Sequence, residues 1–443
     1  MSSLVDKLRS RDARVAVIGV GYVGLPLAVE VAGAGYRVTA YDKNAWKVAK
    51  LQAGESYIKD VPSERVAPLV ASGHLIASTD PDVLAQADAV VICVPTPLNK
   101  SKDPDNSFIL AAADDLIPRM HPDMLVVLES TTFPGFTREV LVPRFQAAGL
   151  VAGKDVFLAF SPERVDPGNE RFHTKNTPKV IGGYTPACLE AVTLLYSTFL
   201  ERLVPVSSTD AAEMVKLLEN TFRAVNIGLV NEVAIMCRKL GLDTWEVIEA
   251  AATKPFGFMP FYPGPGLGGH CIPIDPHYLS WKLKTLKYNA RFIELAGEVN
   301  SGMPEVVLER VTQALNDEQK AVKGSRVLVL GVAYKRDIDD VRESPALDVI
   351  ALLRERGAVV SFHDPFVPSI RLGEDDHGYA PPDAPRLQSV PFSGLHQYDA
   401  VVIVTDHRSV DYARLVKEAK LVIDTRNATK AVRARATARI VTL

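Results

Sequence analysis

Residues 14–42 read RVAVIGVGYVGLPLAVEVAGAGYRVTAYD. An apolar β-branched run leads into the pattern GVGYVG, and an apolar helical pattern follows at once. Gly19 makes the tight turn, Gly21 lets a phosphate group approach the backbone, and Gly24 lets helix and strand pack closely. The stretch therefore predicts a doubly wound α/β domain that binds a dinucleotide.

The end of the second strand in this stretch indicates which dinucleotide binds. Asp42 stands there, 18 residues after Gly24, where a carboxylate accepts hydrogen bonds from the adenosine ribose and repels a 2′-phosphate. NAD is therefore the expected cofactor, and Tyr22 and Val23, inside the glycine pattern, are assigned to its site. An ordinary glycine turn would explain the glycines alone, but not their combination with strand, helix and acid.

Three later strand-like runs end in polar loops. ADAVVICV is followed by Thr96, MLVVLE by Thr131 and DVFLAF by Glu163, and a fourth run, KVIGG, continues the expected parallel sheet. Ligands bind outside the carboxyl ends of such strands. Each residue taken singly is better explained as a strand terminator, and only their shared position favours a site.

A long helical pattern begins after this region. AAEMVKLLENTFRAVNIGLVNEVAIMCRKL runs well past 25 residues. Ser208, Thr209 and Asp210 form an N-cap cluster, with Glu213 three residues after Asp210. So long an apolar helix needs a partner, and we expect it to be the spine of a helical layer that also forms a homodimer interface.

Two polar residues on this helix are candidate site residues. Lys216 and Asn220 lie four residues apart and share a face. A lysine among apolar neighbours can simply carry its ammonium to water. If this face meets the glycine-rich loop described next, an ammonium and an amide together hold a developing oxyanion.

Residues 262–278 read YPGPGLGGHCIPIDPHY, in which four glycines lead to Cys271 and two prolines bracket Asp275. Such a backbone holds a cysteine on a tight, exposed turn, as a nucleophile requires. The plain alternative is a connector with a small buried cysteine. His270, Cys271, Asp275 and His277 match no common metal-site spacing, so we expect no metal.

Residues 323–331 begin a second Rossmann-like sheet. Its glycine turn lacks the dinucleotide pattern and is followed by Tyr334, Lys335 and Arg336, which suits a smaller phosphate ligand. Arg342 precedes a helix and can reach a phosphate or carboxamide. The alternative is that it belongs to a solvated basic loop.

Length and composition limit the remaining possibilities. With 443 residues, 47% of them hydrophobic, the chain suits three domains of about 150 residues, which we place at 1–200, 201–320 and 321–443. No apolar run reaches the roughly 18 residues of a membrane span and no signal region is evident, so a cytoplasmic protein is expected. A formal charge of −3 and scattered cysteines predict no nucleic-acid footprint, disulfide framework or zinc ribbon.

Taken together and in order, the motifs resemble a known family: GVGYVG, VPTP, ESTTFPG, SPER, the Lys216/Asn220 helix, GGHCIPIDP, GVAYK and RES. They are similar to those of the UDP-glucose/GDP-mannose dehydrogenase family over nearly the whole chain. The resemblance implies an NAD-binding Rossmann domain, a helical dimerisation domain and a UDP-sugar-binding Rossmann-like domain. It also implies a four-electron oxidation of the sugar C6 hydroxyl to a carboxylate for polysaccharide biosynthesis, with two NAD used in succession.

The resemblance assigns roles residue by residue. Six form the implied catalytic set: Cys271 as nucleophile, Lys216 and Asn220 at the oxyanion, Asp275 as the acid assisting proton transfer, and Thr131 and Glu163 in thioester hydrolysis. The implied substrate contacts are Glu163, Arg164, Val165, Lys216, Asn220, Gly268, Tyr334 and Lys335, and Thr96, Thr131 and Arg342 join the cofactor contacts. A thiolate that adds to an aldehyde gives a thiohemiacetal, which can release a second hydride, and water then hydrolyses the thioester.

One position departs from the UDP-glucose members, which usually carry a lysine where this chain has Ile274. The loop is most like that of the branch acting on UDP-N-acetylhexosamines. UDP-N-acetylglucosamine is the expected substrate, with UDP-N-acetylmannosamine, UDP-N-acetylgalactosamine and UDP-glucose as alternatives. Two further readings stay open: a two-electron hydroxyacid dehydrogenase, which leaves the third domain without a role, and a non-catalytic nucleotide-sugar sensor.

Overall fold

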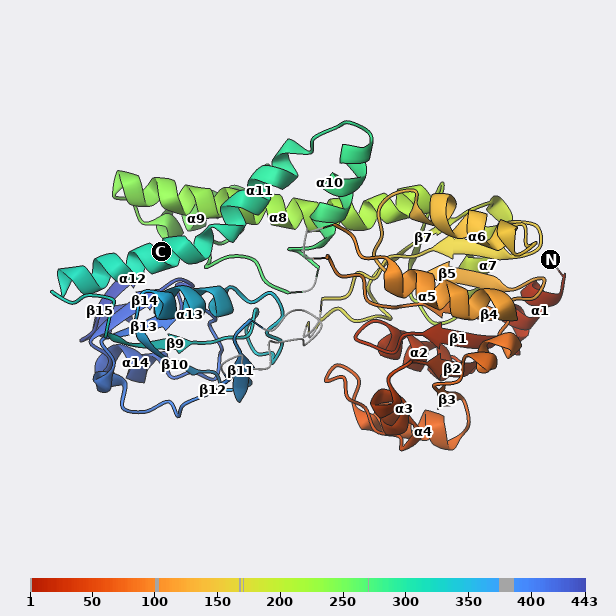
Figure 1. Ribbon diagram of the computed structural model, residues 1–443, viewed down its shortest axis with the longest axis horizontal. Coiled ribbons are helices and arrows are strands. Elements are labelled where there is room, and N and C mark those ends of the chain that lie inside the picture. The colour runs from red at the N-terminus through yellow and green to blue at the C-terminus, as the bar shows by residue number, and fades with distance from the viewer. Residues whose placement is uncertain (1, 100–102, 167–168, 170, 270, 374–385) are drawn as a thin grey trace. The chain divides into compact units, whose positions relative to one another are not determined.

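The computed structural model describes residues 2–99, 103–166, 169, 171–269, 271–373 and 386–443. The chain forms two compact units: Met1–Glu219 with His277–Lys287, and Asn220–Pro276 with Tyr288–Leu443. Each unit contains a β-sheet with helices packed on it (Figure 1). The α/β fold class expected from the sequence is confirmed.

The first unit is built on an eight-stranded sheet in the order β3-β2-β1-β4-β5-β6-β7-β8. Its strands are β1 (Arg14–Ile18), β2 (Arg37–Tyr41), β3 (Leu75–Ser78), β4 (Ala89–Ile92), β5 (Leu125–Leu128), β6 (Phe157–Phe160), β7 (Lys179–Gly183) and β8 (Leu203–Val206). Neighbours are parallel except β6 and β7, so the expectation of a wholly parallel sheet is wrong at this point. The described part of the β6–β7 connection contains no helix, and an antiparallel strand needs no helical crossover.

Both faces of this sheet are covered. Along β1, Val15 and Val17 belong to one hydrophobic core, and Ala16 and Ile18 belong to the other, because side chains alternate across a strand. The first core includes residues of α1 (Ser2–Ser10), α2 (Gly24–Gly33) and α7 (Pro186–Tyr196). The second includes residues of α5 (Ser107–Leu116) and α6 (Val142–Ala147). Burial on both faces explains why these strands read as continuous apolar runs.

The second unit contains a five-stranded parallel sheet in the order β10-β9-β13-β14-β15. Its strands are β9 (Arg326–Leu330), β10 (Val359–His363), β13 (Ala400–Ile403), β14 (Leu421–Asp424) and β15 (Arg439–Thr442), and a separate antiparallel pair joins β11 (Ser369–Arg371) to β12 (Arg386–Gln388). Its helices include α9 (Thr244–Ala252), α11 (Arg291–Ser301), α12 (Met303–Asp317), α13 (Pro345–Glu355) and α14 (Tyr412–Glu418). The second doubly wound sheet is therefore present as predicted.

The long helix predicted after residue 208 is α8 (Thr209–Leu240), 32 residues in length. Ser208 caps it, because its hydroxyl oxygen accepts a hydrogen bond from the Ala211 amide at 3.1 Å. Glu213 takes no part in the cap. Its buried carboxylate accepts hydrogen bonds from the Gly135 amide at 2.6 Å and the Thr137 amide at 2.9 Å. The grouping of Glu213 with the cap cluster is thus corrected, since a long-range partner outcompetes the local one.

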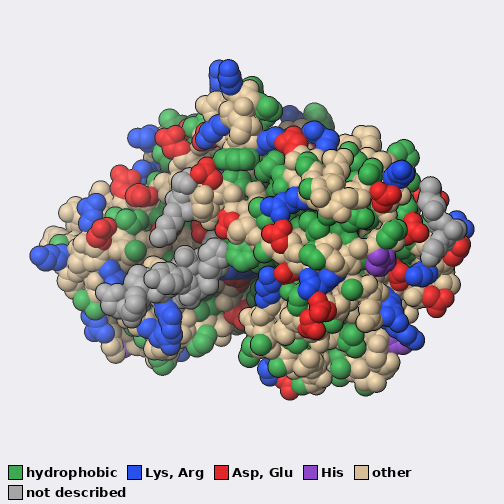
Figure 2. All heavy atoms as spheres, turned by 45° about the vertical axis from the view of Figure 1, so that its right-hand side comes forward, with side chains coloured by type: hydrophobic (Ala, Val, Ile, Leu, Met, Phe, Trp, Pro, Cys, Tyr) green, Lys and Arg blue, Asp and Glu red, His purple; other side chains and the backbone are tan. Residues whose placement is uncertain are grey.

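Surface charge is mixed. Figure 2 shows Lys and Arg side chains interspersed with Asp and Glu side chains and with apolar ones over the face in view. This pattern accords with the formal net charge of −3 and differs from the single-sign stripe of nucleic-acid-binding surfaces. Within the described ranges, no helix is both long enough and apolar enough to cross a bilayer.

Candidate active site

The glycine turn of the first unit has the geometry that a dinucleotide needs. Gly19 has φ +86°, and a Cβ there would lie 2.8 Å from the Cys93 carbonyl oxygen. A Cβ on Gly24 would lie 1.9 Å from the Gly19 oxygen, whereas a Cβ on Gly21 would meet no atom within 4 Å. Val23 stands at the N-cap of α2 without a side-chain hydrogen bond. The turn, the open approach and the uncapped helix N-terminus therefore fit the pyrophosphate of NAD.

Asp42 lies beside this turn, directly after β2. Its carboxylate accepts hydrogen bonds from the Val20 amide at 3.0 Å and the Asn44 amide at 2.8 Å, and it pairs with Lys47 at 3.2 Å. The side chain is 12% exposed. These contacts orient a partly accessible carboxylate next to the glycine turn, where a ribose hydroxyl would be bound.

The three polar residues predicted at strand ends do follow adjacent strands. Strands β4, β5 and β6 are parallel neighbours, and their last residues, Ile92, Leu128 and Phe160, are in register. Thr96, Thr131 and Glu163 come three or four residues after those ends. Thr96 is buried, and Thr131 and Glu163 are half-buried.

Glu163 has partners for both its carboxylate and its main chain. One carboxylate oxygen accepts hydrogen bonds from the Arg164 and Val165 amides at 2.8 and 2.6 Å, and the other accepts one from Lys179 at 2.9 Å. Burial acts to raise the pKa of Glu163, but the Lys179 charge and these hydrogen bonds outweigh burial and lower it. The Glu163 carbonyl oxygen accepts a hydrogen bond from Lys216 at 2.8 Å.

Lys216 is therefore not the water-seeking lysine of the alternative interpretation. Only 9% of the residue is exposed, and its ammonium is directed to the Glu163 carbonyl. Asn220, one turn later on α8, is equally buried and donates to the Asp275 carboxylate at 2.5 Å. Asp275 begins α10 (Asp275–Thr285), and its amide donates to the Cys271 carbonyl at 2.8 Å. Asn220, Asp275 and Cys271 thus belong to one bonded group in the second unit.

Cys271 is exposed, whereas Cys93, Cys188 and Cys237 are buried. This result rules out the plain alternative of a small buried cysteine in a connector. Residue 270, the histidine before it, lies outside the described residues.

The glycines before Cys271 let the loop lie directly on the turn after β9. A Cβ on Gly268 would lie 2.6 Å from the Tyr334 Cβ, and one on Gly269, which has φ +89°, would lie 2.8 Å from the Tyr334 ring. The Gly269 amide also donates to the Arg342 carbonyl oxygen at 3.0 Å. Three predicted ligand contacts, Gly268, Tyr334 and Arg342, are therefore gathered beside the Cys271 loop.

Two of the basic residues after β9, Arg342 and Arg336, are paired with carboxylates. Arg342 forms a forked pair with Asp340, at 3.0 Å from Nε and 2.7 Å from Nη2. Arg336 pairs with Asp406, and Lys335 is half-buried beside it. Arg342 is thus an oriented side chain and not part of a freely solvated basic loop.

Sequence reasoning missed two buried clusters. In the first unit Lys179, Glu129 and Tyr196 lie beside Glu163, with the Lys179 ammonium 2.9 Å from Glu129. In the second unit the Asp337 amide donates to Nδ1 of His407 at 2.9 Å. A lysine opening the strand KVIGG was the one visible signal, and nothing local pointed to His407.

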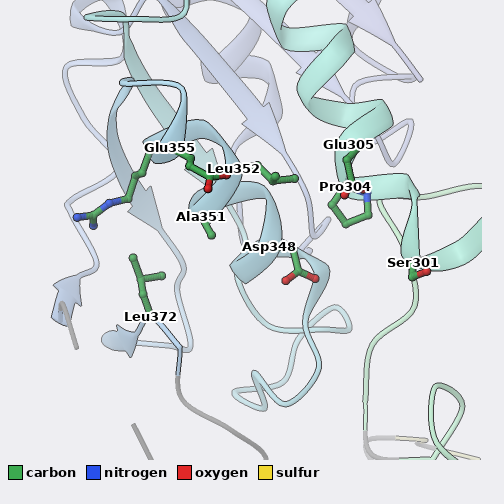
Figure 3. A pocket seen from close by; sticks show the side chains of 9 residues that line it. Ser301, Pro304, Glu305, Asp348, Ala351, Leu352, Glu355 and Leu372 are labelled. Carbon is green, nitrogen blue, oxygen red and sulfur yellow. The ribbon is translucent and has the colours of Figure 1, made fainter. Parts of the chain in front are cut away.

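The second unit also contains a hollow of about 620 Å³ where α12 begins and along α13 (Figure 3). Its lining is mixed in character: Ser301, Pro304, Glu305, Asp348, Ala351, Leu352, Arg354, Glu355 and Leu372. Burial, and after it the Glu305 charge, raise the pKa of Asp348. None of the predicted site residues is among the described residues that line this hollow.

Comparison with known proteins identifies the family. Models of the UDP-glucose/GDP-mannose dehydrogenase family match the chain in three places: the NAD binding domain at residues 13–200, the central domain at 210–302 and the UDP binding domain at 328–431.

Individual relatives agree with these matches. UDP-N-acetyl-D-glucosamine 6-dehydrogenase of Pseudomonas aeruginosa is 34% identical over 399 residues, covering 90% of this chain and 91% of that protein. NDP-N-acetyl-D-galactosaminuronic acid dehydrogenase of Ralstonia nicotianae is 34% identical, covering 95% and 98%. The solved structure of UDP-D-ManNAc dehydrogenase from Pyrococcus horikoshii is 32% identical with a TM-score of 0.86, covering 97% and 99%. With its glycine cradle, its exposed cysteine and these matches, the chain belongs to the UDP-glucose/GDP-mannose dehydrogenase family and is an NAD-dependent nucleotide-sugar dehydrogenase.

Proposed function

We propose that this enzyme oxidises the C6 hydroxyl of a UDP-N-acetylhexosamine, UDP-N-acetylglucosamine in the first place, to the uronic acid through a thioester on Cys271. The observation that carries the proposal is the Cys271 loop itself. Its cysteine is exposed, and its glycines pack against Tyr334. Asp275, four residues after the cysteine, accepts a hydrogen bond from Asn220. Relatives named for N-acetylglucosamine, N-acetylmannosamine and N-acetylgalactosaminuronic acid are similarly close, which supports the sugar class more strongly than one sugar.

NAD would be held by Gly19, Gly21, Gly24 and Asp42, and when bound it accepts the hydride that leaves C6. This chain's residues do the rest. The Cys271 thiolate adds to the aldehyde carbon, forming a C–S bond and an oxyanion. Lys216 and Asn220 carry the donors that stabilise this oxyanion. Asp275, hydrogen-bonded to Asn220, is assigned to take up the proton that the C6 hydroxyl loses when the first hydride leaves.

Hydrolysis completes the reaction. After the second hydride has left, the carbon is a thioester of Cys271, and a water molecule attacks it. The C–S bond then breaks, releasing the carboxylate and regenerating the thiol, as one proton of the water passes to the Glu163 carboxylate and the other to the cysteine sulfur. Thr131 and Glu163 are the residues we assign to holding this water.

A homodimer is also proposed. Along α8, Phe222, Leu229, Met236 and Leu240 are 46%, 54%, 47% and 72% exposed, and their spacing places them on one stripe of the helix. Large exposed apolar side chains in such a stripe are typical of a subunit interface. Sedimentation velocity of the wild type and of Leu229→Glu tests this proposal. A wild-type monomer would contradict it. The domain boundaries 1–200, 201–320 and 321–443 stay predictions.

A substrate panel tests the activity. The purified protein is incubated with NAD and, separately, with UDP-N-acetylglucosamine, UDP-N-acetylmannosamine, UDP-N-acetylgalactosamine and UDP-glucose, and NADH absorbance is followed. We expect the highest kcat/KM with UDP-N-acetylglucosamine. Preference for UDP-glucose would overturn the assigned sugar class, and binding without turnover for all four would favour the sensor.

A further inference from the structure

We propose that Lys179 is a positioning residue of the active site, which fixes both the carboxylate and the main-chain carbonyl of Glu163. The inference rests on the proposed function, because it concerns the hydrolytic step assigned above to Glu163. Lys179 opens β7 and is 3% exposed. A lysine is almost never buried to this extent unless it is paired.

The ammonium of Lys179 bridges two carboxylates. It lies 2.9 Å from Glu129 and 2.9 Å from Glu163, whose side chains are 0% and 16% exposed. Glu129 also accepts a hydrogen bond from the Tyr196 hydroxyl of α7. Lys179, Glu129 and Tyr196 therefore form a buried hydrogen-bonded cluster beside Glu163. Of these four residues, Glu163 is the one that remains partly accessible to solvent.

This buried cluster fixes the conformation of the chain around Glu163. One carboxylate oxygen is bound by Lys179, so the other is turned toward the Arg164 and Val165 amides. The side chain thereby closes a tight turn over its own backbone. The Glu163 carbonyl accepts a hydrogen bond from the Lys216 ammonium. A substitution at Lys179 that moves Glu163 therefore also moves the hydrogen-bond acceptor of Lys216.

The charges in the cluster are unequal in number, with one ammonium between two carboxylates. Burial raises the pKa of Glu129, whereas the pKa of Glu163 is lowered because the Lys179 charge and hydrogen bonds outweigh its burial. Without the ammonium, Glu163 would face Glu129 with no countercharge, and its pKa would rise. Among the described residues, the other titratable or charged groups around Glu163 are Cys93 after β4, Tyr196 on α7, Lys216 on α8, and Arg164 with its partner Glu219.

Removal of this charge has a defined kinetic consequence. A protonated Glu163 cannot accept a proton from the attacking water, so hydrolysis fails first as the pH falls. The first hydride transfer, which precedes the oxyanion assigned to Lys216, does not need this carboxylate. Lys179→Met should therefore retain a burst of NADH formation, lower the steady-state kcat at least tenfold, and move the acidic limb of the kcat profile to higher pH.

Lys179→Met and two further variants test the inference by stopped-flow NADH measurements across pH. Lys179→Arg keeps the charge and should restore the wild-type acidic limb. Lys179→Met/Glu129→Gln removes two opposite buried charges together, which protects folding if the single variant fails to fold. It still leaves Glu163 without its cation, so the limb should stay shifted.

An acidic limb and a burst-to-steady-state ratio identical to wild type in Lys179→Met, or in the double variant, would overturn the positioning role. A stability change alone would move neither quantity. The proposed function fails separately: wild-type enzyme that forms a single NADH per sugar would disprove the thioester route, whatever the Lys179 variants do.

Discussion

Asp42 and Asp364 occupy equivalent places in the two sheets, but only Asp42 keeps an accessible carboxylate. Each follows the second strand of its sheet and accepts a hydrogen bond from the residue after the first glycine, Val20 at 3.0 Å and Val332 at 2.7 Å. The Asp364 side chain is fully buried and bonded to His407 at 3.0 Å, whereas that of Asp42 is 12% exposed. The first sheet therefore has a carboxylate that a ribose could reach, whereas the equivalent carboxylate of the second sheet has only internal partners among the described residues.

The first prediction follows from this difference. Asp42→Asn should raise the KM for NAD about tenfold, as expected for the loss of a charged hydrogen bond worth about 1.4 kcal/mol, and should improve the use of NADP. Asp364→Asn is the matched control and should lower stability without changing the KM for NAD. Steady-state kinetics with NAD and with NADP measure the effect. If Asp42→Asn discriminates between NAD and NADP as the wild type does, the assignment of Asp42 to the adenosine ribose is wrong.

Lys216→Ala should lower kcat by about a hundredfold, equivalent to roughly 3 kcal/mol, the loss seen when one oxyanion donor is removed. Lys239→Ala, an exposed lysine near the end of the same helix, should leave kcat unchanged. The comparison is made at saturating substrate. A kcat equal to wild type in Lys216→Ala would reduce this lysine to an anchor for the Glu163 carbonyl.

His407 should matter for substrate binding. Its Nδ1 accepts a hydrogen bond from the Asp337 amide, and its Nε2 is hydrogen-bonded to the Asp364 carboxylate. Both contacts anchor the turn that carries Tyr334 and Lys335. His407→Phe removes both, so the KM for the UDP-sugar should rise about tenfold with little change in kcat. The exposed His396→Ala is the control. Equal KM values for the UDP-sugar in wild type, His407→Phe and His396→Ala would mean that this turn does not contribute to UDP binding.

Glu213 predicts a pH dependence of stability. Burial raises its pKa to about 7, although hydrogen bonds from Thr137 and Gly135 act to lower it. Because the folded pKa lies above the unfolded one, the folded state binds the extra proton, and this stabilisation is lost as the pH rises through about 7.

Relative to Glu213→Gln, the wild type should therefore lose on the order of 3 kcal/mol of stability between about pH 4.5 and pH 7. Thermal unfolding at several pH values measures the difference. Glu246→Gln, an exposed acid on α9, should show the wild-type profile. A difference between wild type and Glu213→Gln that does not vary with pH would mean that Glu213 stays ionised throughout.

The sequence predicts those parts of the fold that are decided locally. Gly19 and Gly24 mark a turn and a close helix contact that no residue with a Cβ fits, and their spacing alone identifies both. Alternating or continuous apolar runs likewise identify the strands, and Asp42 follows from its distance to the glycines. The exposure of Cys271 could also be expected, because a loop so rich in glycine and proline does not form a packed element.

The remaining features depend on partners distant in sequence. Lys179 meets Glu129 only because β7 and β5 belong to one sheet, and the antiparallel direction of β7 has no local signal. Glu213 resembles a capping residue by spacing, yet it bonds to a loop more than 70 residues earlier. The sequence leaves the direction of the Lys216 side chain open for the same reason, since a helix pattern indicates a face but not what covers it.

The most direct test of the central claim counts NADH formed for each UDP-sugar consumed to completion. Covalent capture on Cys271 predicts two NADH and one uronic acid per sugar for the wild type, and no acid for Cys271→Ser. Cys237→Ser, which changes a buried cysteine of α8, should behave as wild type. One NADH per sugar with a released aldehyde, or acid formation at the normal rate by Cys271→Ser, would contradict the account.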